Sequence, residues 1–178
     1  MKEEVKVLIG EEQLLERIKE IAGRINLEYA GKEVFLLCIL KGSVYFTCEL
    51  SKYLEMPVKL GFMSVTSYGD GLTSSGAVTV NGSTDLDVKG KHVIIIEDII
   101  DTGRTLSFLF HMLAKKNPAS LKLCTLLDKP GSHVSEIKVD YLGFEIPDKF
   151  VVGFGMDYAQ KYRNLPYIGE LVFKEDRE

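Results

Sequence analysis

This chain of 178 residues has the size and composition of one globular domain, because 46% of its residues are hydrophobic and 27% are charged. Its formal net charge is −4, from 22 basic and 26 acidic residues, and no run of Lys or Arg stands out. We therefore expect no nucleic-acid partner, which would require a basic face. The first residues, MKEEVKV, lack an apolar signal core, and no apolar run approaches the roughly 18 residues of a membrane span. These features argue against a membrane protein and favour a cytoplasmic one.

The three cysteines do not predict disulfides or a thiolate metal site. Cys38, Cys48 and Cys124 are odd in number, lie far apart and form no CxxC pair. Cys38 and Cys124 sit in apolar runs, where a cysteine usually serves as a small buried hydrophobic residue. We expect both of them in the core of a protein from a reducing compartment.

The apolar residues predict an alternation of helices and strands. Over residues 11–29 they recur every three or four positions, which is the period of an amphipathic helix. Shorter apolar runs bounded by Gly, Pro or charged residues predict strands. In chain order we predict a helix over 11–29, a strand over 34–40, a helix over 43–54, strands over 58–65, 77–80 and 92–96, a helix over 105–116, and strands over 121–127, 139–144, 150–154 and 169–173.

Residues 67–76 break this alternation. They contain three glycines, few apolar side chains and no periodicity, so we expect a mobile loop. Asn81-Gly82, after the strand predicted over 77–80, favours a tight hairpin turn. A surface loop without any function would have the same composition.

Strands that alternate with helices predict an α/β fold with a central, mostly parallel, twisted sheet and right-handed crossovers. The apolar residues 93–96 belong at the centre of such a sheet, covered on both faces. Ligands of these sheets bind beyond the carboxyl ends of the strands. We therefore look for function in the residues that directly follow each strand.

The strongest such segment follows the strand predicted over residues 92–96. Glu97 and Asp98 place two adjacent carboxylates at the end of a buried strand, which is costly unless they have partners. Residues 101–105, DTGRT, then lead into a helix, and their small residues let backbone N–H groups surround an anion at the helix N-terminus. A phosphate site beside two acids that can hold hydroxyls or a cation suits a phosphorylated sugar.

A plainer interpretation exists for each of these residues alone. Asp101 could be a helix N-cap, and Glu97 with Asp98 could form a solvated turn. The segment contains neither a P-loop pattern nor a GxGxxG pattern, so it does not match those nucleotide sites. The ordered combination of acids, small residues and helix start carries the functional interpretation.

Residues 93–106, VIIIEDIIDTGRTL, resemble the phosphoribosyl-diphosphate motif of the type I phosphoribosyltransferases, and EDIIDTG resembles its hypoxanthine-guanine branch. The resemblance implies that Glu97 and Asp98 hold the ribose hydroxyls and a magnesium ion. It implies that Asp101, near the purine N7, is the general base. The 5-phosphate would be held by the loop of Asp101, Thr102, Gly103, Arg104 and Thr105.

Two further segments match this family. Leu40, Lys41 and Gly42 resemble a loop that binds pyrophosphate, often through a cis peptide before the Lys, and here that bond would join Leu40 and Lys41. Without the resemblance, these residues could form an ordinary strand–helix turn. Ser67 and Tyr68 resemble the start of a mobile loop that closes over the reaction centre and excludes water.

The resemblance also implies a purine site. Lys129, after the strand over 121–127, would donate to the purine O6 and so select 6-oxopurines over 6-aminopurines. Without the resemblance, Lys129 would be a solvated charge and Phe150 a core residue. The implied purine-binding set is Ile99, Lys129, Phe150 for stacking, Val151 for backbone contacts, Met156 and Asp157. Asp157 would also reach magnesium through water, and Arg163 would contact pyrophosphate.

These features together imply a magnesium-dependent phosphoribosyltransferase of purine salvage. Its substrates would be phosphoribosyl diphosphate and hypoxanthine, with guanine as a further base. We expect one domain over residues 1–178, in which the N-terminal segment and residues from about 145 to 178 form a hood over the strand ends. The family resemblance also implies a homodimer or a homotetramer.

Other functions stay open at this stage. The acceptor could be xanthine or a pyrimidine, although the residues around Lys129 and Phe150 argue against a pyrimidine. A regulatory protein that keeps the donor site and binds RNA or DNA would need a basic face. A flavodoxin-like nucleotide-binding domain without catalysis would explain the sheet but not the acidic pair.

Overall fold

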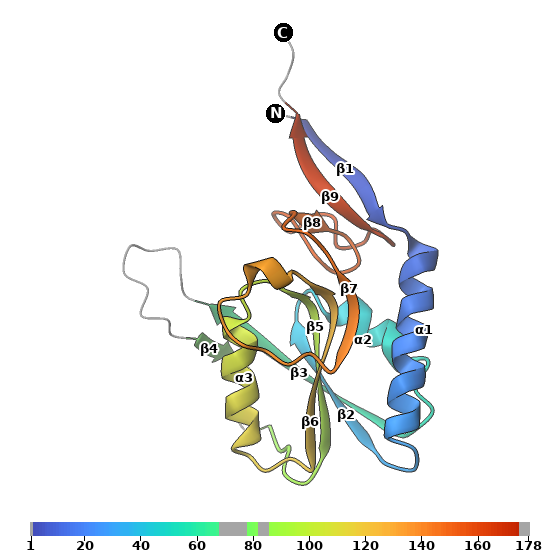
Figure 1. Cartoon of the computed structure of the whole chain (residues 1–178), viewed down its shortest axis with the longest axis vertical. Coiled ribbons are helices and arrows are strands. Elements are labelled where there is room, and N and C mark those ends of the chain that lie inside the picture. Colours follow the sequence, from blue (N-terminus) through green and yellow to red (C-terminus); the bar gives the residue numbers. More distant parts are fainter. Residues whose placement is uncertain (1, 68–77, 82–85, 175–178) are drawn as a thin grey trace.

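The computed structural model describes residues 2–67, 78–81 and 86–174, which form two sheets flanked by helices. Figure 1 shows the larger sheet below and the smaller one above it. The elements are β1 (Lys2–Ile9), α1 (Glu11–Glu28), β2 (Val34–Leu40), α2 (Val44–Ser51), β3 (Val58–Ser67), β4 (Val78–Asn81), β5 (His92–Ile100), α3 (Arg104–Ala114), β6 (Ser120–Asp128), a 3-10 helix η1 (Pro130–Ser132), β7 (Tyr141–Glu145), β8 (Val151–Val152) and β9 (Ile168–Lys174).

The larger sheet has the strand order β4-β3-β2-β5-β6-β7. Strands β3, β2, β5, β6 and β7 run parallel, and β4 is antiparallel to β3. The predicted α/β fold with a mostly parallel central sheet is therefore confirmed. Residues 93–96 of β5 are fully buried between β2 and β6, as their unbroken apolar run predicts.

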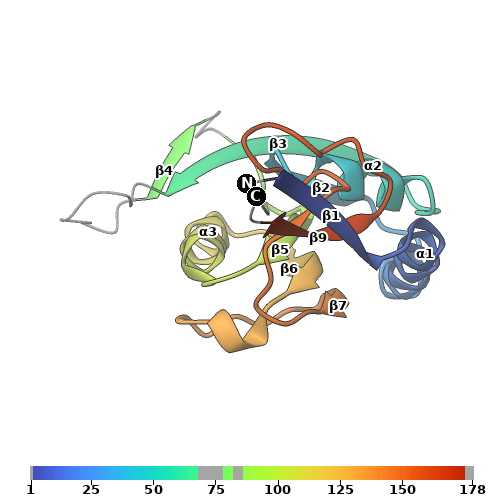
Figure 2. The same cartoon turned by 90° about the horizontal axis from the view of Figure 1, so that it is seen from above.

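Two apolar clusters cover the two faces of this sheet. Ile94 and Ile96 pack with buried residues of α1 and α2, whereas Val93 and Ile95 pack with those of α3. This division follows from the strand period of two, which sends alternate side chains to opposite faces. Figure 2 shows α1 and α3 on opposite sides of the sheet. Cys38 and Cys124 are also fully buried, and all three cysteines are free, as expected.

The smaller sheet has the antiparallel order β1-β9-β8 and lies above the carboxyl ends of the parallel strands (Figure 1). Our sequence analysis predicted no strand before residue 11 and therefore missed β1. Val5, Val7 and Ile9 do alternate with other residues in β1, but the many charges among residues 2–6 mask this period. None of the helices in the described ranges is long and apolar enough to span a membrane.

Several element boundaries differ from prediction for identifiable reasons. Strand β5 continues through Glu97 and Asp98 to Ile100, because its backbone keeps pairing with β6. Helix α2 ends at Ser51 rather than near residue 54, where the chain forms tighter turns before Pro57. Strand β8 covers only two residues of the predicted 150–154, because the backbone turns into positive φ from Gly153 onward.

Strands β3 and β4 pair antiparallel, with Ser64 opposite Asn81 and Ser67 opposite Val78. The predicted mobile loop, including Tyr68, and the predicted turn after Asn81 lie outside the described residues.

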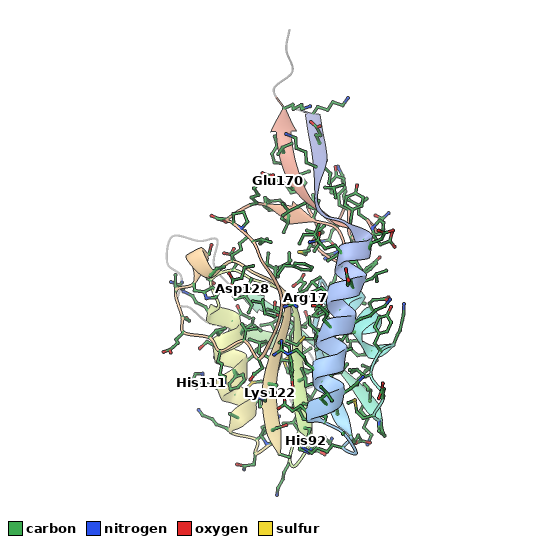
Figure 3. All side chains as sticks on the ribbon, turned by 45° about the vertical axis from the view of Figure 1, so that its right-hand side comes forward. Arg17, His92, His111, Lys122, Asp128 and Glu170 are labelled. Atoms are coloured by element: carbon green, nitrogen blue, oxygen red, sulfur yellow. The ribbon has the colours of Figure 1, made fainter. Side chains whose placement is uncertain are left out.

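A polar cluster joins β6, the start of β7 and the end of α1, and its Lys122 lies away from the smaller sheet (Figure 3). Lys122 contacts Asp140 at 3.1 Å and Glu28 at 3.4 Å, and Tyr141 donates a hydrogen bond to Glu28. The hydrogen bond from Tyr141, followed by that from Lys122, lowers the pKa of Glu28. Because these groups satisfy one another, we interpret the cluster as structural.

Arg17 of α1 protects the edge strand β7. Its Nε donates to the Gly143 carbonyl and its Nη2 to the Leu142 carbonyl, both at 2.9 Å. Within the described ranges no strand pairs with the outer side of β7, so its outward backbone groups need other partners. An arginine from the covering helix supplies them and also ties α1 to the sheet (Figure 3).

We predict that Arg17→Met lowers the free energy of unfolding by about 1–2 kcal/mol, because two charge-assisted hydrogen bonds to backbone are lost. Urea unfolding measures the change. Glu20→Gln is the matched control, since it removes only the exposed ion pair with Arg17. We expect it to change stability by less than about 0.5 kcal/mol. An Arg17→Met protein as stable as the wild type would contradict this role.

Candidate active site

The candidate site lies where strands β2, β5 and β6 end, beneath the smaller sheet (Figure 1). Parallel strands place their carboxyl ends at one edge of the sheet, so residues distant in sequence meet there. The meeting segments are residues 40–43 after β2, residues 97–105 at the end of β5, and residues 128–133 after β6. Residues 150–163 enter the same region from above.

The segment after β2 is packed too closely to accept a side chain at Gly42. A Cβ atom at this position would lie 1.6 Å from Asp98 Oδ2, and one at Gly155 would lie 2.0 Å from the Gly42 carbonyl oxygen. The peptide bond between Leu40 and Lys41 is cis, as the sequence resemblance implies. The buried Ser43 hydroxyl donates to the Ile39 carbonyl at 2.5 Å. Glycine is therefore required where these three segments touch.

The acidic pair ends the central strand with its two carboxylates close together. The Ile99 amide donates to Asp98 Oδ1 at 2.9 Å, and the Asp98 amide donates to Glu97 Oε1 at 3.3 Å. Burial of the Glu97 carboxyl and the adjacent negative charge of Asp98 raise the pKa of Glu97 well above its ordinary value. Among the described residues, no Lys or Arg forms an ion pair with either acid.

The loop that follows β5 turns directly into helix α3. Gly103 takes a left-handed conformation at the helix N-cap, with φ of 75°, and Arg104 is the first helical residue. The Thr102 carbonyl accepts a hydrogen bond from the Val134 amide at 3.1 Å, which holds the loop against the chain after β6. Buried Leu106 and Leu109 fix the helix on the sheet. The free amides of this N-terminus therefore face the site from a rigid support.

Two cavities meet at this edge of the sheet. The first has a volume of about 240 Å³, and its lining comprises Ile39, Leu40, Val65, Glu97, Ile99, Ile100, Asp101, Thr102, Gly103, Thr105 and Leu106. The second has a volume of about 260 Å³ and is lined by Asp98, Ile99, Asp101, Lys129, Phe150, Val151, Met156 and Asp157. Ile99 and Asp101 line both.

The structure brings many of the candidate residues together at this edge of the sheet, but not all of them line a cavity. Every residue of the expected purine set lines the second cavity. Lys41, Gly42, Arg104 and Arg163 of the expected donor set line neither. Ser67 is the last residue of β3, and its expected loop partner Tyr68 lies outside the described part of the chain.

Lys129 is buried, and its ammonium has a partner that the sequence did not reveal. Its Nζ donates to Asp148 Oδ1 at 3.1 Å, and its backbone amide donates to the Ile100 carbonyl at 3.0 Å. His133 Nε2 lies 2.6 Å from Asp128 Oδ1, directly beside this segment. Asp128 is the last residue of β6 (Figure 3). Its place at the carboxyl end of a strand is the one feature of the sequence that could have identified it as a site residue.

Asp157 and Arg163 form an ion pair above the second cavity. Arg163 Nη2 lies 2.6 Å from Asp157 Oδ1, and its Nη1 donates to the Gly155 carbonyl at 2.6 Å. The Gln160 amide donates to Asp157 Oδ2 at 2.8 Å. Both carboxylate oxygens are therefore engaged, and Gly155 connects this segment to the loop after β2.

Residues 10–159 match the model of a protein family described as the phosphoribosyl transferase domain. The hypoxanthine-guanine phosphoribosyltransferase of Streptococcus thermophilus is 45% identical over 171 residues, which are 96% of this chain and 94% of that protein. That of Lactococcus lactis is 49% identical and covers 93% and 90%. A crystal structure of a hypoxanthine-guanine phosphoribosyltransferase from Bacillus anthracis has a TM-score of 0.89 and 42% identity, covering 96% of this chain and 100% of that one.

The chain therefore belongs to the phosphoribosyltransferase family, and it is a transferase. The two non-catalytic alternatives, a regulatory nucleic-acid binder and a flavodoxin-like domain, are thereby set aside. Within the family it belongs with the hypoxanthine-guanine enzymes, the branch that residues 97–103, EDIIDTG, predict.

We predict that Gly42→Ala raises the KM for the phosphoribosyl donor at least about tenfold, because the added methyl group collides with Asp98 and displaces the acidic pair. Steady-state kinetics measure this change. Gly23→Ala in α1 is the matched control, since a Cβ atom there meets nothing within 4 Å. We expect the control to keep full activity and to gain slight helix stability. Equal kinetics for both variants would refute the constraint at Gly42.

Proposed function

We propose that this enzyme of purine salvage transfers the 5-phosphoribosyl group of phosphoribosyl diphosphate to N9 of hypoxanthine, and also of guanine. The bond from the anomeric carbon to the diphosphate oxygen breaks, the bond from that carbon to N9 forms, and pyrophosphate leaves. The products are IMP or GMP. The single observation that best supports this reaction is the pair of cavities that meet at Ile99 and Asp101, one suited to the donor and one to the base.

The first cavity supports a donor site because it combines a helix N-terminus with an acid. Thr102, Gly103 and Thr105 line it at the start of α3, where free backbone amides attract a phosphate group. Glu97 lines the same cavity and Asp98 the next, so the pair can accept hydrogen bonds from ribose hydroxyls. We assign the diphosphate to Leu40, Lys41 and Gly42, and we assign further phosphate contacts to Arg104 and Arg163.

The residues present fit a magnesium ion. Glu97 and Asp98 are adjacent carboxylates, and burial together with the neighbouring charge of Asp98 raises the pKa of Glu97. A divalent cation would offset the negative charge of this pair, and carboxylate oxygens are the ligands that Mg²⁺ prefers. We propose that Glu97 and Asp98 hold it, together with Asp157 through water. When bound, magnesium supplies positive charge that stabilises the leaving pyrophosphate.

The second cavity supports recognition of a 6-oxopurine. Buried Lys129 presents N–H donors, which suit the O6 of hypoxanthine or guanine and repel the amino group of adenine. Phe150 is 52% exposed at this cavity, so its ring is free to stack on a base. We assign base-edge hydrogen bonds to the Val151 backbone and apolar contacts to Ile99 and Met156, whose side chains line the same cavity.

Asp101 stands between the two cavities, which suits it to proton transfer. It lines both cavities, and the residue is exposed at their junction. We propose that Asp101 accepts the proton from purine N7 as N9 attacks the anomeric carbon. The rigid support of α3 below this loop would hold the carboxylate in place during the reaction.

Further proposals concern the chain as a whole. Residues 1–178 would act as one domain, with the sheet β1-β9-β8 as the hood above the site. The enzyme would work in the cytoplasm as a homodimer or homotetramer, and its three free cysteines accord with a reducing compartment.

We predict that Asp101→Asn lowers kcat by about a hundredfold or more, because the general base is lost while the geometry stays. Donor affinity, measured by equilibrium binding of phosphoribosyl diphosphate, should stay near the wild-type value. Turnover equal to that of the wild type would remove Asp101 from the role of base.

We predict IMP formation from hypoxanthine, GMP from guanine, and little product from adenine or uracil. Product analysis with each base, including xanthine, measures the preference. Omission of magnesium, with a chelator present, should abolish product, because the carboxylate pair and the diphosphate then lack their shared cation. The proposal fails if no 6-oxopurine is converted with magnesium present.

A further inference from the structure

Phe150, the ring assigned to base stacking, belongs to a row of three aromatic residues that leads into the smaller sheet. Its ring centroid lies 5.7 Å from that of Tyr158, with an interplanar angle of 89°. Tyr158 in turn lies 5.5 Å from Phe173 of β9, at 68°. Both contacts have the edge-to-face geometry that aromatic rings prefer.

The contact with Tyr158 matters for the orientation of the Phe150 ring because Phe150 is largely exposed. A ring that is 52% exposed has few neighbours to fix its side-chain rotamer, and Phe173 is 47% exposed. Perpendicular packing against Tyr158 fixes the plane of the Phe150 ring and still leaves at least one of its faces open. A ring that stacks on a base needs an open face and a fixed plane. A freely rotating ring would lose conformational entropy when the base binds, and this loss would weaken binding.

Tyr158 is itself held firmly. Its backbone exchanges two hydrogen bonds with Lys161, and the Asp157 carboxylate accepts a hydrogen bond from the Gln160 amide inside the same turn. Ala159 and Gln160 have positive φ, so this turn has one defined conformation. The ring of Tyr158 is therefore a rigid neighbour for Phe150.

The backbone of Phe150 is tied to the same strand as the far end of the row. The Leu171 amide of β9 donates to the Phe150 carbonyl at 2.9 Å, and Phe173 follows two residues later on that strand. The smaller sheet therefore fixes Phe150 twice, through its main chain and through its ring.

We infer that Tyr158 is a positioning residue for the acceptor base: its ring, supported by Phe173, sets the plane of Phe150 and so determines affinity for the purine. This inference rests on the proposed function of the second cavity. The aromatic ring carries the role, and the Tyr158 hydroxyl does not.

The test compares variants of the full-length enzyme in steady-state kinetics, with hypoxanthine and phosphoribosyl diphosphate varied separately. Tyr158→Leu should raise the KM for hypoxanthine about three- to tenfold, the range that loss of an aromatic pair corresponds to. The KM for the donor should stay within about twofold, because the first cavity does not contact this row. Phe173→Leu should shift the hypoxanthine KM in the same direction by less.

Two further variants distinguish a loss of Phe150 orientation from a general disturbance of the fold. Tyr158→Phe keeps the ring and should retain the wild-type KM for hypoxanthine. On a Phe150→Leu background, Tyr158→Leu should add no further increase, since the ring that it orients is gone. Phe108→Leu removes a ring of α3 that is 45% exposed, close to the 47% of Phe173, and serves as the control for loss of an aromatic residue.

The outcomes separate this inference from the proposed function. If the wild type converts no 6-oxopurine, the proposed function fails. If the wild type is active and Tyr158→Leu keeps its hypoxanthine KM, the positioning role is overturned. An equal rise in the KM of both substrates, or an undiminished effect on the Phe150→Leu background, also overturns it, because Tyr158 would then act on the fold rather than on Phe150.

Discussion

The contact between Gly42 and the Asp98 carboxylate determines how the ends of the two central strands fit together. The loop after β2 must have a residue without a side chain at position 42, since a Cβ atom there would lie 1.6 Å from Asp98 Oδ2. The Gly42 carbonyl in turn leaves no room for a side chain at Gly155. Through these two glycines, the loop after β2, the acids of β5 and the segment above the second cavity become one packed unit. A side chain added at Gly42 or at Gly155 would therefore affect the binding of both substrates.

The length of β5 explains how one strand can serve two ligands. Because β5 stays extended to Ile100, its alternate side chains point to opposite sides even where they are polar. Glu97 lines the first cavity and Asp98 the second, while Ile99 reaches both. A turn directly after Ile96, which the sequence suggested, would have lost this alternation. Continued pairing with β6 lets the two adjacent acids line different cavities and places Asp101 where these cavities meet.

Much of this arrangement could be predicted because its signals are local. The buried strand at 93–96, the acids behind it and the start of α3 follow each other within fourteen residues, 93–106. The partners of Lys129 and Asp128 depend on tertiary packing instead. Asp148 is an exposed acid with no local signal, and His133 is a lone histidine. Strand β1 was missed because its stability comes from pairing with β9, more than 150 residues away. Long-range pairing of this kind leaves little trace in local composition.

The residues that line the donor cavity lie mostly close together in the sequence, whereas those that line the acceptor cavity lie far apart. The donor cavity is built mostly from one continuous segment, so a short motif encodes it. The acceptor cavity gathers residues from β5, the chain after β6 and the segment around β8. Phe150 and Val151 depend on β9 for their backbone position, and β9 depends on β1. The two ends of the chain therefore cooperate to shape the base site, which lets substitutions in the smaller sheet alter the base preference while the donor site stays intact.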